Sequence, residues 1–199
     1  MQSSALPANA VQADTRAQWR RWLQSHHTQT TGLWLVMWKK ASGRVQLAYD
    51  AAVEEALCFG WVDSKAGKLD EHRSLLWFAP RKAGTGWSAP NKQRVQRLIE
   101  SGAMAGPGLA KVHAAQADGS WSLLDAVEAL VLPDDLAQAL AAVPAAAEHW
   151  HAFPRSAKRG ILEWITLAKT AATRSKRVDE TARLAGLNQR ANQWKPKIP

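Results

Sequence analysis

Apolar spacing in the first two thirds of the chain predicts a mixture of helices and strands. Trp19 and Leu23 lie one helical turn apart, as the inward face of a helix over residues 14–25 requires. Two continuous apolar runs follow, at 33–38 and 74–78, and each suits a strand buried in a sheet. We therefore expect a small sheet with flanking helices in this part of the chain.

Turn residues and gaps in the pattern divide the rest of this region. Residues 1–13 carry neither charge nor periodicity, which predicts a disordered leader. Residues 81–89 hold two glycines and no periodicity, which predicts a loop. The further expected elements are a helix from 49 to about 60, strand signal from 61 to 80, a helix from 90 to 99 and a helix from 108 to 117.

Beyond Pro133 the pattern is helical throughout. Gly186 follows the last apolar position and suits a helix terminator. The fold class is therefore α+β, with an N-terminal small sheet with flanking helices plus a C-terminal all-helical domain. The expected helices cover 134–143, 145–153, 156–172 and 173–185, and the expected domains are a leader over 1–13, an α+β domain over 14–131 and a helical domain over 132–195.

Composition places the chain among folded globular proteins. Of its 199 residues, 46% are apolar and 22% are charged, which excludes a largely disordered chain. Cys58 is the single cysteine, so a disulfide framework is excluded as well. The N-terminus lacks the basic start and apolar run of a signal peptide, and no stretch reaches the roughly 20 apolar residues of a membrane span. We expect a cytoplasmic protein with no membrane span.

Charge narrows the classes of partner. The formal net charge is +9, which favours acidic partners, and the basic residues are concentrated at the two ends of the chain. The sequence also has 11 tryptophans, which serve either as core residues or as exposed stacking surfaces. A protein, a small anionic ligand and nucleic acid all remain possible partners on this evidence.

The chain carries no recognised catalytic or metal-binding motif. His26 and His27 point apart on a helix, and His149 and His151 share a face only on a strand, although they lie in helical sequence. Cys58 lies among apolar neighbours, which favours a buried thiol over a nucleophile. Phosphate-binding glycine loops and the common hydrolase motifs are absent. We expect no metal and no cofactor. The motifs leave enzymatic activity open and favour a protein that is not an enzyme.

Polar and aromatic residues gather where the expected strands begin and end. One interpretation is a site for an anionic or planar ligand, with Arg81 as a forked donor and Trp61 or Trp87 as a stacking wall. The other is that these side chains hold a long loop onto the core. Under either interpretation an Asp63–Arg81 ion pair is feasible. We name this set the polar rim; it comprises Trp61, Asp63, Lys65, Arg81, Lys82, Trp87, Ser88, Asn91 and Lys92.

A second cluster of cations lies in the expected C-terminal helices. It is a candidate surface for nucleic acid or another anion. The alternative is a solvated helical surface, because Lys176 and Glu180 are spaced i, i+4 and neutralise part of the charge. The cluster comprises Arg155, Lys158, Arg159, Lys169, Arg174, Lys176 and Arg177.

Several of these residues also stand in ordered motifs. They are Ala-Leu-Cys-Phe-Gly-Trp-Val-Asp at 56–63, Phe-Ala-Pro-Arg-Lys at 78–82, Trp-Ser at 87–88, Lys111, Asp-Gly at 118–119, Trp121 and Leu-Pro-Asp-Asp-Leu at 132–136.

With these motifs the chain resembles the YdeI/OmpD-associated family, also labelled bacteriocin-protection proteins, over nearly residues 19–187. The resemblance implies an N-terminal α+β domain, a C-terminal helical domain and a role in stress or antimicrobial-peptide protection. It supplies no catalytic residues. A chain at +9 repels cationic peptides, so any protective role would be indirect.

Three functions therefore remain in competition. The first is a non-enzymatic cytosolic accessory or binding protein of the YdeI/OmpD-associated type. The second is a nucleic-acid-binding protein that uses the basic C-terminal helices. The third is a small-molecule-binding protein or an enzyme at the polar rim, for which Arg81 and Asp63 are the residues to test.

Overall fold

The computed structural model describes residues 5–44 and 46–193. Their contacts divide the chain into two compact units, residues 1–122 and residues 123–199, and each is considered by itself. The first unit contains a sheet and helices and the second contains helices, so the fold class is α+β, as the hydrophobic pattern predicts. The domain boundary expected at 131–132 stays a prediction.

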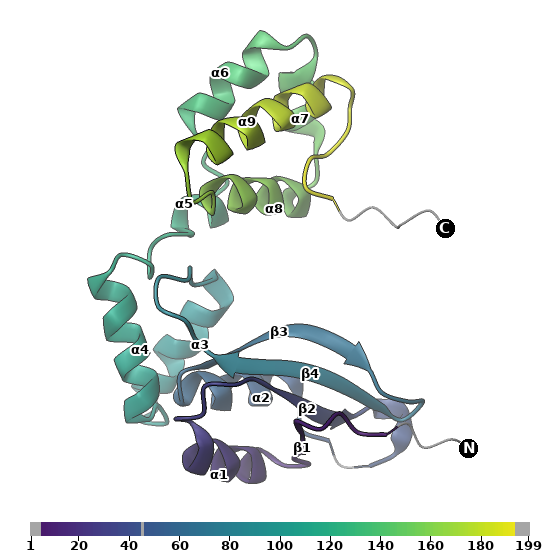
Figure 1. Cartoon of the computed structure of the whole chain (residues 1–199), viewed down its shortest axis with the longest axis vertical. Helices are drawn as coiled ribbons and strands as arrows, with labels where there is room; N and C mark the ends of the chain where they lie inside the picture. Colours follow the sequence, from purple (N-terminus) through teal and green to yellow (C-terminus); the bar gives the residue numbers. More distant parts are fainter. Residues whose placement is uncertain (1–4, 45, 194–199) are drawn as a thin grey trace. The chain divides into compact units, whose positions relative to one another are not determined.

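The first unit is built on a four-stranded sheet with the strand order β1-β2-β4-β3 (Figure 1). β1 pairs with β2 in parallel, whereas β2 with β4 and β4 with β3 are antiparallel. The two continuous apolar runs form β2 and most of β4, as predicted. The strands are β1 (Ala10–Gln12), β2 (Leu33–Trp38), β3 (Trp61–Lys68) and β4 (Arg73–Pro80).

β1 corrects the expectation of a disordered leader over 1–13. Val11 lies opposite Leu35 in the parallel pairing and packs against the core. Three residues are too short to show periodicity, and β1 is paired with a strand more than twenty positions away, so the sequence carries no local signal for it. Residues 1–4 of the expected leader lie outside the described residues.

Helices α1 and α2 cover one face of the sheet, as Figure 1 shows. Trp19 and Leu23 of α1 are fully buried there, together with Trp61 and Phe78 of the sheet. Thr15 caps α1 by accepting a hydrogen bond from the backbone of Gln18. The elements on this side are α1 (Arg16–His26), the short 3-10 helix η1 (Lys40–Ser42) and α2 (Tyr49–Cys58).

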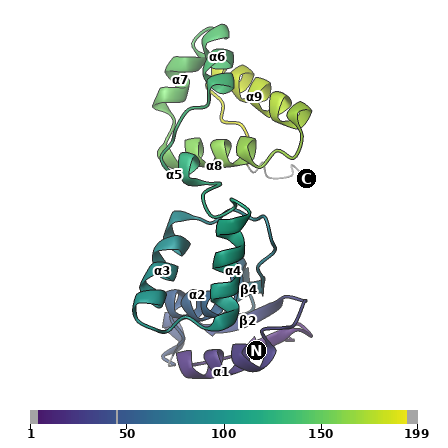
Figure 2. The same cartoon turned by 90° about the vertical axis from the view of Figure 1, so that its left-hand side faces the viewer.

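Two further helices, α3 (Ala89–Glu100) and α4 (Gly106–Ala117), pack on α2 (Figure 2). Gly108 lets α4 approach closely, because a Cβ atom at this position would overlap the carbonyl oxygens of Leu57 and Cys58. This close approach places α4 beside the end of β4, where the candidate site lies.

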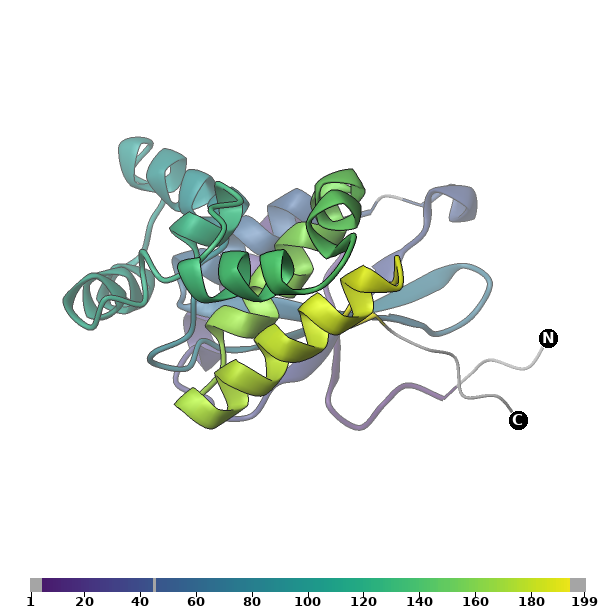
Figure 3. The same ribbon diagram turned by 90° about the horizontal axis from the view of Figure 1, so that it is seen from above.

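The second unit has its own core, in which Leu136, Trp150 and Ile161 are buried. Its longest helix, α9, packs on α6, α7 and α8 (Figure 3). The helices are α5 (Asp125–Glu128), α6 (Asp134–Ala142), α7 (Ala146–Ala152), α8 (Arg155–Thr166) and α9 (Ala171–Gly186).

The break between α8 and α9 falls earlier than the sequence predicts. Thr170 caps α9, and its hydroxyl oxygen accepts a hydrogen bond from the backbone of Thr173 at 3.1 Å. The sequence places Thr170 inside a helix over 156–172, because the apolar spacing continues through this position. Residues 194–195 of the expected helical domain lie outside the described residues.

Within 5–44 and 46–193, no helix combines the length and the apolar character needed to cross a membrane.

Candidate functional site

Arg81 is the first residue after β4, and its side chain turns into the protein. Its backbone N–H donates to the carbonyl oxygen of Gly60 at 2.9 Å, which continues the pairing of β3 and β4 by one residue. Only 6% of Arg81 is exposed, an unusual degree of burial for an arginine.

The guanidinium of Arg81 is held by an aromatic ring and by the loop that follows. It lies 3.6 Å from the centroid of the Trp87 ring. Its Nη2 donates to the carbonyl oxygens of Gly86 at 2.5 Å and Thr85 at 3.3 Å. Its buried Nε has no hydrogen-bond partner among the residues that the structure describes. In the described part of the chain, no carboxylate forms an ion pair with Arg81.

Burial without a counter-ion sets the electrostatics of this site. It lowers the pKa of Arg81 to about 10, and loss of contact with water is the cause. The side chain therefore remains a cation at neutral pH. A buried cation without an anionic partner is costly, and an entering anion would offset that cost.

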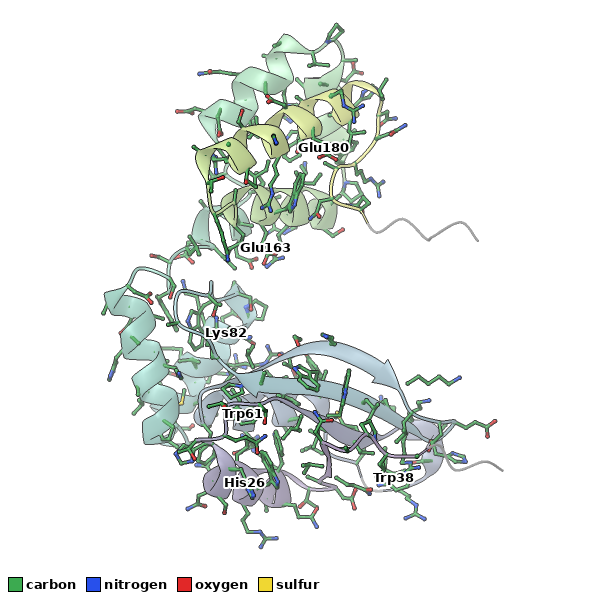
Figure 4. The ribbon with its side chains drawn as sticks, in the orientation of Figure 1. His26, Trp38, Trp61, Lys82, Glu163 and Glu180 are labelled. Carbon is green, nitrogen blue, oxygen red and sulfur yellow. The ribbon has the colours of Figure 1, made fainter. Side chains whose placement is uncertain are left out.

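A cavity of about 50 Å³ lies against Arg81. We call it the Arg81 cavity. One wall is the loop after β4, which includes Lys82 and Thr85; Figure 4 shows Lys82 on this segment. The other wall is the end of α4 with the turn after it, which contributes Lys111, Asp118 and Ser120.

Gly60 helps to place Lys111 at the cavity. Its φ of +77° belongs to the left-handed region that favours glycine, and the turn from α2 into β3 depends on it. A Cβ atom on Gly60 would come within 2.8 Å of the Cγ of Lys111. The glycine therefore leaves room for the Lys111 stem to lie along this turn.

Asp118 is the carboxylate that lines the cavity, and it is already engaged. Its two oxygens accept hydrogen bonds from the backbone of Ser120 at 2.9 Å and of Gly84 at 3.2 Å. Hydrogen bonds from Ser120 and then from Gly84 hold the pKa of Asp118 below its usual range. Asp118 thus fastens the loop after β4 to the end of α4, and its charge opposes only part of the charge of the cations around it.

The first three residues of the polar rim do not line the Arg81 cavity. Trp61, labelled in Figure 4, is fully buried. Its Nε1 donates to the carbonyl oxygen of His27 at 3.2 Å. Asp63 accepts a hydrogen bond from the hydroxyl of Tyr49 at 2.7 Å. Lys65 is exposed, with its Nζ 5.9 Å from the ring of Trp77. The Asp63–Arg81 ion pair, which the sequence left feasible, does not form, because Asp63 pairs with Tyr49 and Arg81 with Trp87 and Gly86.

The last three residues of the polar rim belong to the start of α3. Ser88 is the N-cap residue, although its side chain makes no capping hydrogen bond. The Oδ1 of Asn91 accepts from Arg94 at 3.0 Å. The Nζ of Lys92 lies 5.2 Å from the ring of Trp121. Of the nine residues in the polar rim, Arg81, Lys82 and Trp87 are the ones that line the Arg81 cavity.

Most cations of the C-terminal cluster already have partners within the second unit. Arg159 pairs with Glu128 and Glu163 at 2.8 Å, and Arg174 pairs with Asp135 at 2.7 Å. Three more donate to backbone carbonyl oxygens: Arg155 to that of Glu128, Lys158 to that of His151 and Arg177 to that of Trp164. Arg177 also lies over the ring of Trp164. The last two members, Lys169 and Lys176, are exposed.

Sequence reasoning missed Lys111, Asp118 and Ser120 as members of the site. Two of them stand in the motifs that carry the family resemblance, which was the one available signal. Their position beside Arg81 follows from the packing of α4 on α2, and sequence spacing does not reveal it.

Cys58 is not among the residues that line the Arg81 cavity. Cys58 is fully buried, and burial raises the pKa of its thiol. Over the residues that the structure describes, no three His, Cys, Asp or Glu side chains group closely enough to hold a metal ion.

Two family models match the chain. Residues 11–111 match a domain of unknown function, DUF8412. Residues 129–186 match the family described as bacteriocin-protection, YdeI or OmpD-associated, which confirms the resemblance for this segment. Neither the curated proteins nor the solved structures contain a match.

Proposed function

Because the chain belongs to the DUF8412 family and its second unit carries the YdeI/OmpD-associated segment, we propose that it is an accessory protein of that type which binds an anionic ligand in the Arg81 cavity. The first unit provides this site. The ligand is held and not transformed.

One observation carries the proposal: the Arg81 guanidinium is buried, borders a cavity and has no carboxylate partner within residues 5–44 and 46–193. A charged side chain that is this deeply buried for structural reasons is normally paired with an opposite charge. In the same unit, the buried Glu55 carboxylate is paired in this way with Arg16 and Arg20. An oxyanion in the Arg81 cavity would supply the missing charge and accept from the forked donor.

The electrostatics suit binding better than proton transfer. A general acid or base works best with a pKa near the working pH. Arg81, with a pKa of about 10, keeps its charge at neutral pH and therefore acts as a fixed cation. This supports a binding protein over an enzyme.

Calorimetric titration tests the proposal. Phosphate, sulfate and acetate are titrated at constant ionic strength into the wild-type protein, Arg81→Met and Arg44→Met. Arg44 is the matched control, since it also lies over a tryptophan, at 4.6 Å from the Trp38 ring, and its substitution removes the same charge. We expect saturable binding of at least one anion to the wild type and to Arg44→Met, and loss of at least tenfold in affinity in Arg81→Met. Equal affinity in all three proteins would reject the cavity as the site.

The physiological role that we propose is indirect protection against antimicrobial peptides or bacteriocins from within the cytoplasm. The family segment motivates it, and the charge of +9 argues against direct capture of cationic peptides. A deletion strain complemented with wild type or Arg81→Met and challenged with several peptides tests this role. We expect only the wild type to restore survival; unchanged survival after deletion would contradict the role.

Nucleic-acid binding by the second unit has less support. Arg159 and Arg174, which would contact phosphates, are committed to carboxylates. Each would have to give up an ion pair in order to bind.

A further inference from the structure

We infer that the group bound in the Arg81 cavity is a dianionic phosphate monoester at the end of a small molecule, with the rest of that molecule outside the cavity. This inference rests on the proposed function and names its ligand class. Three properties of the site lead to it: its size, its charge and the geometry of its donors.

Size limits what enters. The cavity measures about 50 Å³, whereas a single water needs about 10–15 Å³ of such space. It therefore accommodates a group of about three to five heavy atoms, such as a carboxylate or a tetrahedral oxyanion. A nucleoside or a sugar ring does not fit, so only the anionic end of a larger ligand enters.

Charge separates a dianion from a monoanion. The cavity is lined by the cations of Arg81, Lys82 and Lys111 and by the carboxylate of Asp118, which leaves two positive charges in excess. A phosphate monoester carries about −1.5 to −2 at pH 7 and matches this excess. A carboxylate or a phosphodiester, at −1, would leave one cation unmatched.

Donor geometry agrees with this assignment. The planar guanidinium of Arg81 is fixed on Trp87 and by the loop carbonyls, so it presents its remaining N–H groups in one orientation. Lys82, in the loop after β4, and Lys111, in α4, line the cavity from different elements and act as mobile point charges. A tetrahedral phosphate offers oxygens to both walls at once, which a planar carboxylate cannot do as well.

The test compares anions of different charge and shape by calorimetry at constant ionic strength. The probes are inorganic phosphate, glycerol 3-phosphate, sulfate, dimethyl phosphate and acetate. At about pH 8, where the first three are dianions, we expect them to bind at least tenfold more tightly than the two monoanions. Lowering the pH to about 5, below the second phosphate pKa of about 6, should weaken the binding of glycerol 3-phosphate and leave the binding of sulfate unchanged.

Two lysine variants locate the charge preference. Lys111→Gln and Lys82→Gln change exposed side chains, so both proteins should fold. Each should lower the affinity for glycerol 3-phosphate by more than it lowers the affinity for acetate. If neither variant reduces the difference in affinity between glycerol 3-phosphate and acetate, the two lysines do not select the dianion and the inference is wrong.

The outcomes distinguish the inference from the proposed function. If acetate binds as tightly as phosphate and both depend on Arg81, the anion site stands and the phosphate assignment is overturned. If no anion binds, the proposed function itself is overturned. Vesicles of phosphatidylcholine with and without phosphatidic acid separate the two sources of a phosphate monoester. Binding to the acidic vesicles without binding to glycerol 3-phosphate would overturn the small-molecule assignment.

Discussion

Two charged side chains are buried in the first unit, and they are stabilised in opposite ways. Glu55, which is 2% exposed, accepts from Arg16 at 2.5 Å and Arg20 at 2.8 Å. Arg81, which is 6% exposed, lies against an aromatic ring and donates to two carbonyl oxygens, and no carboxylate of the described residues pairs with it. The first charge is neutralised within the fold, and the second is left for a ligand to neutralise.

The difference shows which buried charge serves the fold and which serves function. Glu55 joins α1 to α2, and its partners Arg16 and Arg20 reach it from one helix face. Arg81 borders a cavity with two lysines. A site that holds a charge without a partner lowers stability, and proteins tend to keep such sites where binding requires them.

The largest loss of stability is expected when the Glu55 carboxylate loses both of its arginine partners. The double variant Arg16→Met, Arg20→Met keeps the apolar stems but strands the Glu55 carboxylate. We expect it to lower the free energy of unfolding by about 3–5 kcal/mol, as measured by urea denaturation. Adding Glu55→Gln should recover part of this loss. A loss below about 1 kcal/mol in the double variant would contradict the role given to Glu55.

A much smaller change in stability is expected at Arg81. Arg81→Met keeps an unbranched apolar side chain beside Trp87 and removes an unneutralised cation. The two residues whose carbonyls lose a donor, Thr85 and Gly86, are exposed and half-buried. The free energy of unfolding should stay within about 1 kcal/mol of the wild type, or rise. Urea denaturation without added anion measures it. A loss of about 3 kcal/mol or more would show that Arg81 is needed for the fold, as an arginine in a structural ion pair would be.

The pH dependence of this difference sharpens the comparison. Burial lowers the pKa of Arg81 to about 10, so the folded protein releases this proton at a lower pH than the unfolded chain. The cost of the buried cation is fully present below that pH and is relieved as the pH rises through it. Any stability advantage of Arg81→Met over the wild type should therefore shrink above pH 10. Urea midpoints of both proteins at about pH 8 and pH 11 check this, and a constant difference would contradict it.

The smallest effect concerns Asp63, the partner that the sequence suggested for Arg81. Burial, followed by the hydrogen bond to Asp63, raises the pKa of Tyr49 to about 12. The chain has one tyrosine, so the absorbance of tyrosinate reports on it alone. We expect Asp63→Asn to lower the midpoint of this titration and to leave anion affinity unchanged. An unchanged midpoint would contradict the contribution of Asp63 to the raised pKa of Tyr49.

Sequence patterns predicted the elements whose signals are local. The apolar run at 33–38 became β2 with the same bounds, and the spacing of Trp19 and Leu23 gave the buried face of α1. β1 was missed because it depends on pairing with β2, a non-local contact. The α8–α9 break was misplaced because its cap lies inside a continuous apolar pattern.

The site was predicted only where its residues are neighbours in sequence. Arg81, Lys82 and Trp87 follow one strand, and their types alone suggested an anion or aromatic site. Lys111 and Asp118 reach the cavity because Gly108 lets α4 lie against α2. No spacing rule connects residues that are brought together by helix packing, so this half of the site required the structure.

The most direct test of the central claim is the NMR signal of the Arg81 Nε–H group, assigned by its disappearance in Arg81→Met. This group is buried, and no described residue offers it a hydrogen bond, so it should respond when an oxyanion binds the guanidinium. Titration with phosphate at constant ionic strength should shift the signal in a saturable way, while chloride leaves it in place. A signal that is unmoved by phosphate, or moved equally by chloride, would contradict an anion site at Arg81.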